Sequence, residues 1–383
     1  MEMEKMIELI DAVSKSDLTG FKYEEDGIKL HLSKKENTCY VTENVSAPVN
    51  MTGTASDGVV SAEMGKTNAE GDQTLGAAAE EAVVGNIVES PLVGTFYSAP
   101  AEDAESFVKV GDRVSGAPLK PCMKCDDCQN GNFSLCKHYS FIGSREQGSN
   151  ADYVVIPEQN AVVYDSSISY EQAAMFEPST VALHGLLQNE YQGGQYVAVL
   201  GGGTIGMFTM QWAKIFGSRK VVVFDISEER LELAKRLGAD AVINTTKENY
   251  MQEAMALTGK KGYGYVFETA GQIPTMHMAF ELAGNKANVC FIGTPHAELT
   301  FTPAMWENMN RKEFHLTGSW MSYSAPFPGK EWELTAHYFA TGQLKFDPGF
   351  IYKKVPMSQA QEAFQMFKTP GLVKGKVLLV NES

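Results

Sequence analysis

The sequence predicts an α/β protein built around a doubly wound parallel sheet. The first observation is a repeated alternation. The β-branched runs YVAVL (196–200) and KVVVFD (220–225) are separated by a stretch with helical spacing, and further strand-like runs follow at 240–243, 265–269 and 288–294. Strands that alternate with helices assemble into parallel sheets with helices on both faces. The second observation is the glycine-rich turn GGGTIG, which joins the first of these strands to the first helix.

The residues ahead of this sheet predict three short and dissimilar segments. Residues 1–36 combine an amphipathic helix with a hairpin, because apolar and polar residues alternate after the turn Asp26-Gly27. Residues 37–83 are rich in Ala, Gly, Ser and Thr and include acidic residues, a composition typical of a flexible linker. Residues 84–114 hold short β-branched runs interrupted by Pro and Gly, which indicates a small β-structure.

Four cysteines, in the string PCMKCDDCQNGNFSLC, follow these segments: Cys122, Cys125, Cys128 and Cys136. Four thiolates can close a tetrahedral zinc site that has no open position, so this spacing predicts a structural zinc. An iron–sulfur run of the ferredoxin type is the main alternative, but it expects a shorter last gap and a proline after the fourth cysteine. Disulfides are the other alternative, and a reducing compartment disfavours them.

The glycine turn predicts a nucleotide site. Gly201, Gly203 and Gly206 form GxGxxG, and Thr204 and Ile205 complete the turn into the helix. Glycine lets the backbone approach a pyrophosphate that is held at the amino end of the helix.

An acidic residue at the end of the second predicted strand is expected to distinguish NAD from NADP. Asp225 is placed to accept hydrogen bonds from a ribose 2′-hydroxyl, and its charge would repel a 2′-phosphate, so we expect NAD rather than NADP. The alternatives are a glycine turn in a nucleotide-free α/β protein, and a helix-capping role for Asp225.

The composition limits the classes of molecule that the protein is expected to bind. The chain has 383 residues, 44% of them hydrophobic, and a formal net charge of -15, which disfavours nucleic acid and anionic membrane surfaces. No apolar stretch reaches the roughly 18 residues that a membrane span needs. The amino terminus is charged where a signal peptide would be apolar, and the cysteines cluster at metal-ligand spacing, so we expect a cytoplasmic protein.

From about Gly111 onward the chain resembles the zinc-dependent medium-chain alcohol and polyol dehydrogenases. The resemblance rests on the four-cysteine lobe, the glycine turn and the closing GKVLLV. It also rests on HYSFIGSREQGSNADYVVIP (138–157), FEPSTVALHG (176–185), ETAG (268–271), FIGT (291–294) and GSWMSYSAPFPGKEWE (318–333). It implies a zinc lobe with the remnant of a GroES-like catalytic domain over 115–160, an NAD-binding Rossmann domain over 161–310 and a return to the catalytic domain over 311–383.

The resemblance also implies a reaction and further site residues. The family transfers hydride between a polyol carbon and nicotinamide, and a second zinc polarises the alcohol oxygen. Enzymes for polyol phosphates such as galactitol 1-phosphate are the nearest in motif. Glu177 in FEPST would lie at that catalytic zinc, although it could also simply flank a helix before Pro178, and Thr269 and Thr294 would join the coenzyme site.

The Cys and the His-Glu pair expected at the catalytic zinc have no counterpart in this sequence. The family supplies a Cys and a His-Glu pair ahead of the four-cysteine lobe, whereas here only Cys39 and His31 precede Cys122, in unrelated contexts. We therefore expect an incomplete catalytic zinc site and a truncated catalytic domain, and turnover by this chain becomes the question to test.

The front end resembles the biotin carboxyl carrier protein of acetyl-CoA carboxylase, a component of fatty acid biosynthesis. A helix and hairpin, a low-complexity linker and ESPLVGTFYSAPAEDAESFVKVGDRV (89–114) follow that family's order. The biotin-accepting lysine has no counterpart, because Lys66 and Lys124 have other neighbours, so no biotin is expected.

Three further hypotheses concern partners and origin. From the carrier resemblance, the front end would bind acetyl-CoA carboxylase subunits as an interaction protein. A homo-oligomer is a further hypothesis, since the sequence does not settle the oligomeric state. Alternatively, the chain is a recombination or assembly chimera joined near VGDRV (110–114), a string that is plausible in either parent.

Overall fold

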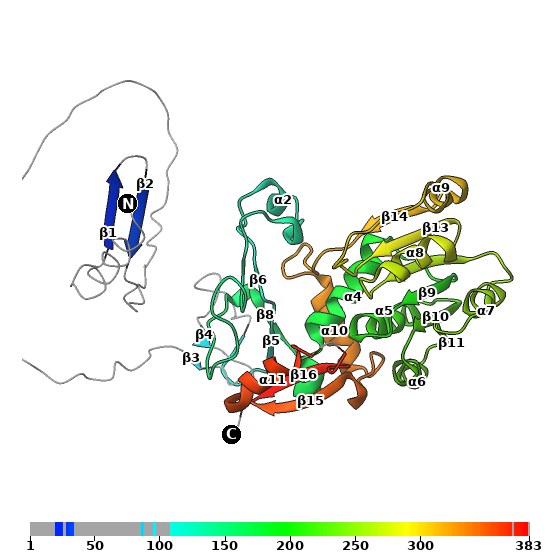
Figure 1. Cartoon of the computed structure of the whole chain (residues 1–383). Coiled ribbons are helices and arrows are strands. Elements are labelled where there is room, and N and C mark those ends of the chain that lie inside the picture. Colours follow the sequence, from blue (N-terminus) through cyan, green and yellow to red (C-terminus); the bar gives the residue numbers. More distant parts are fainter. Residues whose placement is uncertain are drawn as a thin grey trace, which may run out of the picture. The chain divides into compact units, whose positions relative to one another are not determined.

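The computed structural model describes residues 108–369 and 371–381, together with four short strands of the preceding part. The chain divides into two units, residues 1–78 and 79–383. In the first unit, β1 (Gly20–Glu25) and β2 (Ile28–Ser33) form an antiparallel hairpin (Figure 1), as the alternation after Asp26-Gly27 predicts. The predicted amino-terminal helix and the predicted linker lie outside the described residues.

The second unit is organised around a six-stranded sheet in which every neighbouring pair is parallel. Its order is β11 (Ala241–Asn244), β10 (Lys220–Asp225), β9 (Tyr196–Leu200), β12 (Tyr263–Glu268), β13 (Ala283–Phe291) and β14 (His315–Gly318). The first strand in sequence lies in the middle and the chain winds outward in both directions. This confirms the doubly wound prediction.

The central strands are buried on both faces, which explains their continuous apolar runs. In β9, Val197 and Val199 pack into one core while Ala198 and Leu200 pack into the other, because successive side chains of a strand point to opposite faces. Residues of α5 and α6 enter the first core with α4 and α10, and residues of α7 and α8 enter the second (Figure 1). These helices are α4 (Phe176–Gln188), α5 (Thr204–Ile215), α6 (Glu228–Leu237), α7 (Tyr250–Leu257), α8 (Ile273–Leu282) and α10 (Lys330–Ala340).

Several strand boundaries differ from the predicted ones. Strand β13 begins at Ala283, ahead of the predicted 288, because AGNK carries no apolar signal. Strand β14 was not predicted: it is short, it lies at an edge of the sheet and none of its four residues is buried. The sheet therefore continues past residue 310, the end that we expected for the nucleotide domain. Helix α9 (Pro303–Lys312) connects β13 to β14.

The remaining described residues form small two-stranded sheets and short helices. Strand β5 (Val114–Gly116) pairs with β8 (Ala161–Val163), and β6 (Leu119–Lys120) pairs with β7 (Ser140–Phe141) at the base of the cysteine lobe. The other elements are β3 (Asn86–Ile87), β4 (Thr95–Phe96), α2 (Asp126–Gln129), η1 (Phe133–Leu135), η2 (Glu158–Asn160), α3 (Tyr170–Ala173), η3 (Pro348–Phe350), β15 (Ile351–Pro356), η4 (Met357–Gln359), α11 (Ala360–Met366) and β16 (Lys376–Val380). Within the described part of the chain, no helix has the length and apolar character that crossing a bilayer requires.

Candidate functional site

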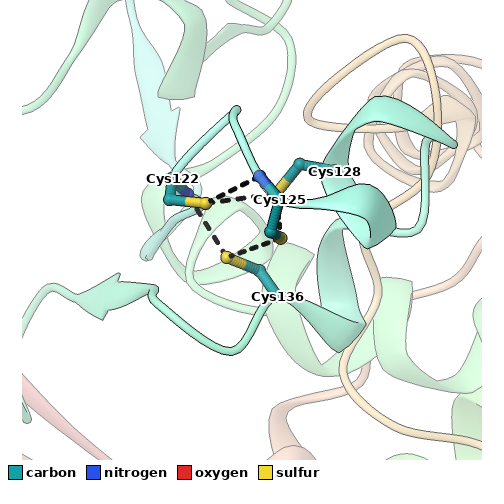
Figure 2. A group of neighbouring side chains, drawn as sticks. All are labelled: Cys122, Cys125, Cys128 and Cys136. Carbon is teal, nitrogen blue, oxygen red and sulfur yellow. Dashed lines mark hydrogen bonds between the residues drawn. The ribbon is translucent and has the colours of Figure 1, made fainter.

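The four-cysteine lobe brings four sulfur atoms together (Figure 2). Cys122 follows β6, Cys125 caps the amino end of α2, Cys128 lies within α2 and Cys136 follows η1. All four Sγ atoms lie within 4.8 Å of one another, and three pairs are separated by 3.9, 3.5 and 3.9 Å. Tetrahedral zinc with bonds of about 2.3 Å requires sulfur atoms about 3.8 Å apart, so the donor set fits the predicted ion.

Local hydrogen bonds favour the thiolate form of one cysteine in the lobe. The amide nitrogens of Lys124 and Cys125 donate to the Cys122 Sγ over 3.5 and 3.4 Å, and these bonds lower the pKa of the Cys122 thiol to about 6. Burial instead raises the pKa of Cys128 to about 12. A thiol must lose its proton to bind zinc, so a cation is needed to hold both sulfurs as thiolates at neutral pH. Among the described residues, no other group of three or more His, Cys, Asp or Glu side chains converges in this way.

The glycine turn packs so tightly that only glycine fits at one position. A Cβ on Gly206 would lie 1.8 Å from the Gly201 carbonyl oxygen, whereas a Cβ on Gly203 would meet nothing within 4 Å. Gly201 itself has a backbone φ of +104°, which residues with a side chain rarely adopt. Gly203 caps α5 without a side-chain hydrogen bond, and Thr204 and Ile205 begin that helix. The amino end of α5 therefore has free space for a phosphate group beside it.

Asp225 lies at the carboxyl end of β10 and is joined to the glycine turn. Its Oδ2 accepts a hydrogen bond from the Gly202 amide over 2.6 Å, and its Oδ1 accepts one from the Ser227 amide over 2.8 Å. Ser227, not Asp225, is the capping residue of α6, so the capping alternative for Asp225 is wrong. The Arg230 guanidinium lies 3.7 Å from the same Oδ2. An acid and an arginine are thus both present where a ribose would bind.

The structure places Thr269 and Thr294 at the same edge of the sheet. Thr269 follows β12 and its hydroxyl donates to the Leu200 and Gly201 carbonyl oxygens, at 2.9 and 3.1 Å. Thr294 lies just beyond β13, and its carbonyl oxygen would be 2.5 Å from a Cβ on Gly271. In a parallel sheet, the carboxyl ends of the strands are where ligands bind.

The sequence interpretation missed Glu268, the last residue of β12. Its fully buried carboxylate accepts hydrogen bonds from the Ala270 and Gly271 amides and from the Thr275 hydroxyl. Burial raises its pKa while these hydrogen bonds oppose that effect. Glu268 therefore orders the turn that follows β12.

A cavity of about 240 Å³ opens beside the glycine turn. The turn and α6 form one wall, and Gly349, Phe350 and Lys374 of the carboxyl-terminal part form the other. Two ion pairs connect these walls, Arg236 with Asp347 at 3.1 Å and Lys374 with Glu229 at 3.2 Å. The cationic side chains of the cavity are therefore each paired with a carboxylate, and the amino end of α5 is the feature that suits an anionic ligand.

Glu177 lies in the first turn of α4 and lines a second cavity, also of about 240 Å³. The lining is largely apolar and includes Ile142, Val154, Ile156 and Tyr164. Burial raises the pKa of Glu177, and the charge of Lys376 acts in the opposite direction. No histidine or cysteine is among the described residues that line this cavity. A second zinc needs at least three protein ligands, so the described residues do not fit one.

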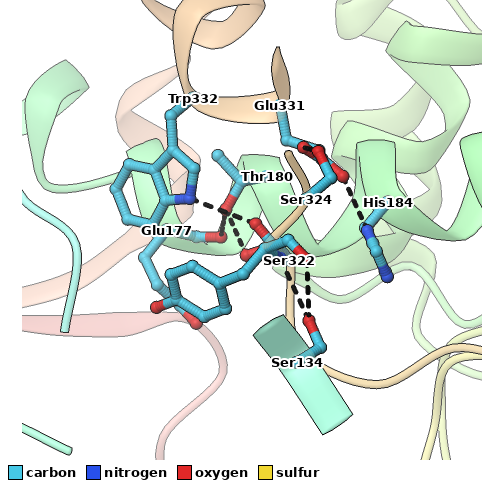
Figure 3. Close-up of polar contacts among 9 residues, drawn as sticks. Ser134, Glu177, Thr180, His184, Ser322, Ser324, Glu331 and Trp332 are labelled. Carbon is cyan, nitrogen blue, oxygen red and sulfur yellow. Dashed lines mark hydrogen bonds and ion pairs between the residues drawn. The ribbon is translucent and has the colours of Figure 1, made fainter. Parts of the chain in front are cut away.

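Near Glu177, a network of buried polar side chains connects three parts of the chain (Figure 3). Ser134 of the cysteine lobe contacts the Tyr323 backbone, Ser322 contacts Thr180 of α4, and His184 of α4 contacts Glu331 of α10. These contacts join residues separated by 142 to 189 positions in sequence. Serine and threonine are common polar residues, so local sequence gave no signal for the network.

Comparison with protein-family models yields two matches. Residues 204–337 match a family described as zinc-binding dehydrogenase, and residues 84–166 match the alcohol dehydrogenase GroES-like domain. The second match begins at residue 84, so it includes the stretch 84–114 that we interpreted as resembling a carrier β-domain.

Comparison with individual proteins adds close relatives. The chain is 35% identical over 270 residues to galactitol 1-phosphate 5-dehydrogenase of Escherichia coli K12, covering 70% of this chain and 78% of that protein. It is 30% identical over 261 residues to D-arabitol-phosphate dehydrogenase of Enterococcus avium, covering 67% and 72%.

Solved structures agree with these relatives. The crystal structure of galactitol-1-phosphate dehydrogenase from Escherichia coli superposes with a TM-score of 0.67 at 34% identity, covering 73% of this chain and 79% of that chain. A zinc-binding dehydrogenase from Sinorhizobium meliloti 1021, solved bound to NADP, gives 0.63 at 26% identity, covering 73% and 80%.

Proposed function

Because the chain belongs to the zinc-dependent medium-chain family of alcohol and polyol dehydrogenases, we propose that it binds NAD and one structural zinc and oxidises a polyol phosphate. The observation that carries this proposal is the joined unit of glycine turn and Asp225 at the carboxyl edge of a doubly wound sheet. Galactitol 1-phosphate is the first substrate to test, since the relative at 35% identity is named for it.

NAD is the proposed coenzyme because of the charge at the end of β10. The Asp225 carboxylate would accept hydrogen bonds from a ribose 2′-hydroxyl and would repel a 2′-phosphate. Arg230, 3.7 Å from that carboxylate, has the opposite preference, but its charge is partly neutralised by Asp225. The NADP bound to the Sinorhizobium relative makes this choice worth a direct measurement.

Each part of the site has a separate task in the proposed reaction. The amino end of α5 and the cavity beside Arg236 and Lys374 would hold the phosphate groups of the coenzyme. NAD would supply the hydride acceptor: the substrate carbon loses a hydride, the alcohol becomes a carbonyl group, and the hydroxyl proton is released to solvent. Glu177 and the largely apolar cavity above it would receive the polyol end and keep water away from it.

The two metals of the family differ in how they fit this chain. The cysteine lobe fits zinc, and Cys122, Cys125, Cys128 and Cys136 would hold it as a structural ion. Glu177 is without histidine or cysteine partners among the described residues, so we assign no step of the reaction to a second zinc there.

Formation of NADH by the purified full-length chain tests the proposal. The protein is supplied with zinc, NAD and galactitol 1-phosphate, and absorbance at the NADH band is followed. Glu177→Ala is measured in parallel with Glu232→Ala, which changes an exposed glutamate of α6.

Turnover that disappears in Glu177→Ala and persists in Glu232→Ala would support the proposed enzyme. Absence of turnover in the unmodified chain, with NAD and one zinc bound, would overturn it and leave a nucleotide-binding protein. D-arabitol phosphate, supplied in the same assay, separates the two polyol phosphates that name relatives.

The match of residues 84–166 to the alcohol dehydrogenase GroES-like domain favours the dehydrogenase family over a carrier for residues 84–114. The carrier-like interpretation of residues 1–83 remains a prediction, as do carboxylase partners and a chimeric origin. A peptide spanning Phe107 to Lys120, produced by a protease that does not cleave at Lys or Arg and detected by mass spectrometry in the native organism, would show that both parts are made as one chain. Detection of two separate proteins, each lacking the joint, would contradict it.

A further inference from the structure

One serine of the cysteine lobe forms hydrogen bonds with a distant part of the chain. Ser134 lies in η1, between Cys128 and Cys136, so the closing of the lobe fixes its position. The buried Ser134 hydroxyl accepts a hydrogen bond from the Tyr323 amide over 3.1 Å and donates one to the Tyr323 carbonyl oxygen over 3.3 Å. One side chain thus satisfies both backbone groups of a residue 189 positions away.

Aromatic packing supports the same contact. Phe133, beside Ser134, meets Phe327 edge to face with ring centroids 5.3 Å apart, and Phe327 stacks on Tyr323 at 5.8 Å. A Cβ on Gly131 would lie 2.8 Å from the Ala325 Cβ, so the lobe and this segment approach as closely as glycine allows. Residues 322–327 therefore follow any displacement of the lobe.

Ser322, the residue before Tyr323, contacts α4. The Ser322 and Thr180 hydroxyls are 2.8 Å apart, and the Trp332 indole nitrogen donates to the Ser322 carbonyl oxygen over 3.2 Å. Thr180 in turn donates to the Glu177 carbonyl oxygen over 2.7 Å. Because Ser322 and Tyr323 are consecutive, the contact with the lobe and the contact with α4 cannot move independently (Figure 3).

A second anchor fixes the other end of the segment. Ser324 donates to the Glu331 carboxylate over 2.6 Å, and the other oxygen of that carboxylate lies 2.7 Å from the His184 Nδ1 on α4. Buried hydrogen-bonded networks of this kind are rigid when every member is satisfied. The segment is consequently held against α4 at two points, in addition to its contacts with the lobe.

We propose that residues 322–324 couple the four-cysteine lobe to α4, and that Ser134 and Ser322 are positioning residues for the Glu177–Thr180 turn. Metal binding in the lobe then orders the face of α4 that lines the candidate substrate cavity, although the metal takes no part in the reaction. The inference rests on the proposed function only in assigning the substrate to that face. Its test uses neither substrate nor coenzyme, so its failure is distinguishable from failure of the proposed reaction.

Hydrogen–deuterium exchange of the full-length protein measures the coupling directly. Peptides over 118–137, 176–181 and 320–327 are compared between the zinc-loaded protein and the protein treated with a chelator. We expect exchange at 176–181 to accelerate about fivefold or more on zinc removal, the factor that corresponds to the loss of about one buried hydrogen bond. Residues 204–215 of α5, which also pack in this core, should change little and serve as the internal control.

Two serine variants test whether the coupling runs from the lobe through residues 322–324 to α4. In zinc-loaded Ser134→Ala, exchange at 320–327 and 176–181 should already be fast. The thiolate-to-cobalt band of the cobalt-substituted protein should remain, which shows that the lobe itself is intact. Ser144→Ala, in an exposed serine near the lobe, is the matched control and should behave like the unmodified chain.

Ser322→Ala breaks the connection at the other end and covers the case in which Ser134→Ala does not fold. Zinc removal should then give little further change at 176–181. Coupling free energies are reciprocal, so Ser322→Ala should also release zinc to a competing chelator more readily, by the same factor.

Two results would overturn the proposal. Zinc removal could accelerate exchange only within 118–137 and leave α4 as it was, which would make the lobe an independent unit. Alternatively, 176–181 and 204–215 could accelerate together, which would indicate general loosening of the core instead of a route through residues 322–324.

Discussion

The amide nitrogen of Gly202 lies 2.6 Å from Oδ2 of Asp225, so the turn after β9 and the acid at the end of β10 form one hydrogen-bonded unit. A bond this short to a carboxylate is charge-assisted and fixes the acid rigidly. The carboxylate is buried with its second oxygen bonded to Ser227, which leaves it little freedom to turn away from a ligand. The backbone therefore holds the acid that we propose to select the coenzyme in one orientation.

Asp225→Asn should change coenzyme preference. It removes the charge that attracts ribose hydroxyls, and we expect NAD to bind about tenfold more weakly, the effect of losing one hydrogen bond to a charged group. NADP should bind more tightly than before, because repulsion disappears and Arg230 becomes available. Titration calorimetry with both nucleotides checks this, and Asp152→Asn, in an exposed loop, is the control. Unchanged affinity for NAD would argue that the ribose lies elsewhere.

Two glycine substitutions separate folding from binding. Gly206→Ala places a Cβ 1.8 Å from the Gly201 carbonyl oxygen, so the backbone must shift and the free energy of unfolding should fall by about 2–3 kcal/mol. Gly203→Ala meets no atom within 4 Å and has an ordinary φ, so the fold should keep its stability. Its methyl group would nevertheless occupy space needed by a pyrophosphate and should weaken NAD binding. Urea unfolding and nucleotide titration measure the two effects, and equal stability of both variants would contradict the packing argument.

Local patterns predicted the parts of this molecule whose determinants are local. The runs at 196–200 and 220–225 give β9 and β10 because both strands are covered on both faces. The cysteine spacing brings four sulfurs together because α2 and η1 turn the chain within a few residues. In both cases the signal and the structure lie within a short stretch of chain.

Non-local features escaped prediction for a physical reason. The His184–Glu331 contact joins residues 147 positions apart, and neither residue carries a pattern that names the other. Strand β14 has no buried residue, so its apolar content resembles that of a loop. Pairing with β13, which supplies its hydrogen bonds, is a tertiary event.

Zinc removal should lower the stability of more than the lobe. Cys128, Phe133 and Cys136 pack in the core that also holds residues of α4, so an unliganded lobe loosens its contact with that helix. We expect one zinc per chain, and a fall of about 4–8 °C in the melting temperature for each 2 kcal/mol that the metal contributes. Metal analysis and calorimetry before and after chelation provide the measurement. Cys136→Ser should lose the zinc, whereas Cys290→Ser, in β13, should retain it. Bound iron in place of zinc would contradict the assignment.

The buried His184–Glu331 contact should contribute far more to stability than an exposed ion pair. Both side chains are buried and Glu331 has hydrogen bonds on both oxygens, so its removal leaves His184 and Ser324 without partners. Breaking such a pair from one side costs about 3–5 kcal/mol, and Glu331→Ala should lower the free energy of unfolding by about that amount. Glu331→Gln, which keeps the size and one acceptor, should cost less.

The exposed pair Arg311–Glu307 provides the comparison, because solvent screens its charges. Glu307→Ala should change the free energy of unfolding by less than about 0.5 kcal/mol. If Glu331→Ala and Glu307→Ala were equally mild in urea unfolding, the buried network could not hold residues 322–324 against α4. The coupling between lobe and substrate cavity would then need another route.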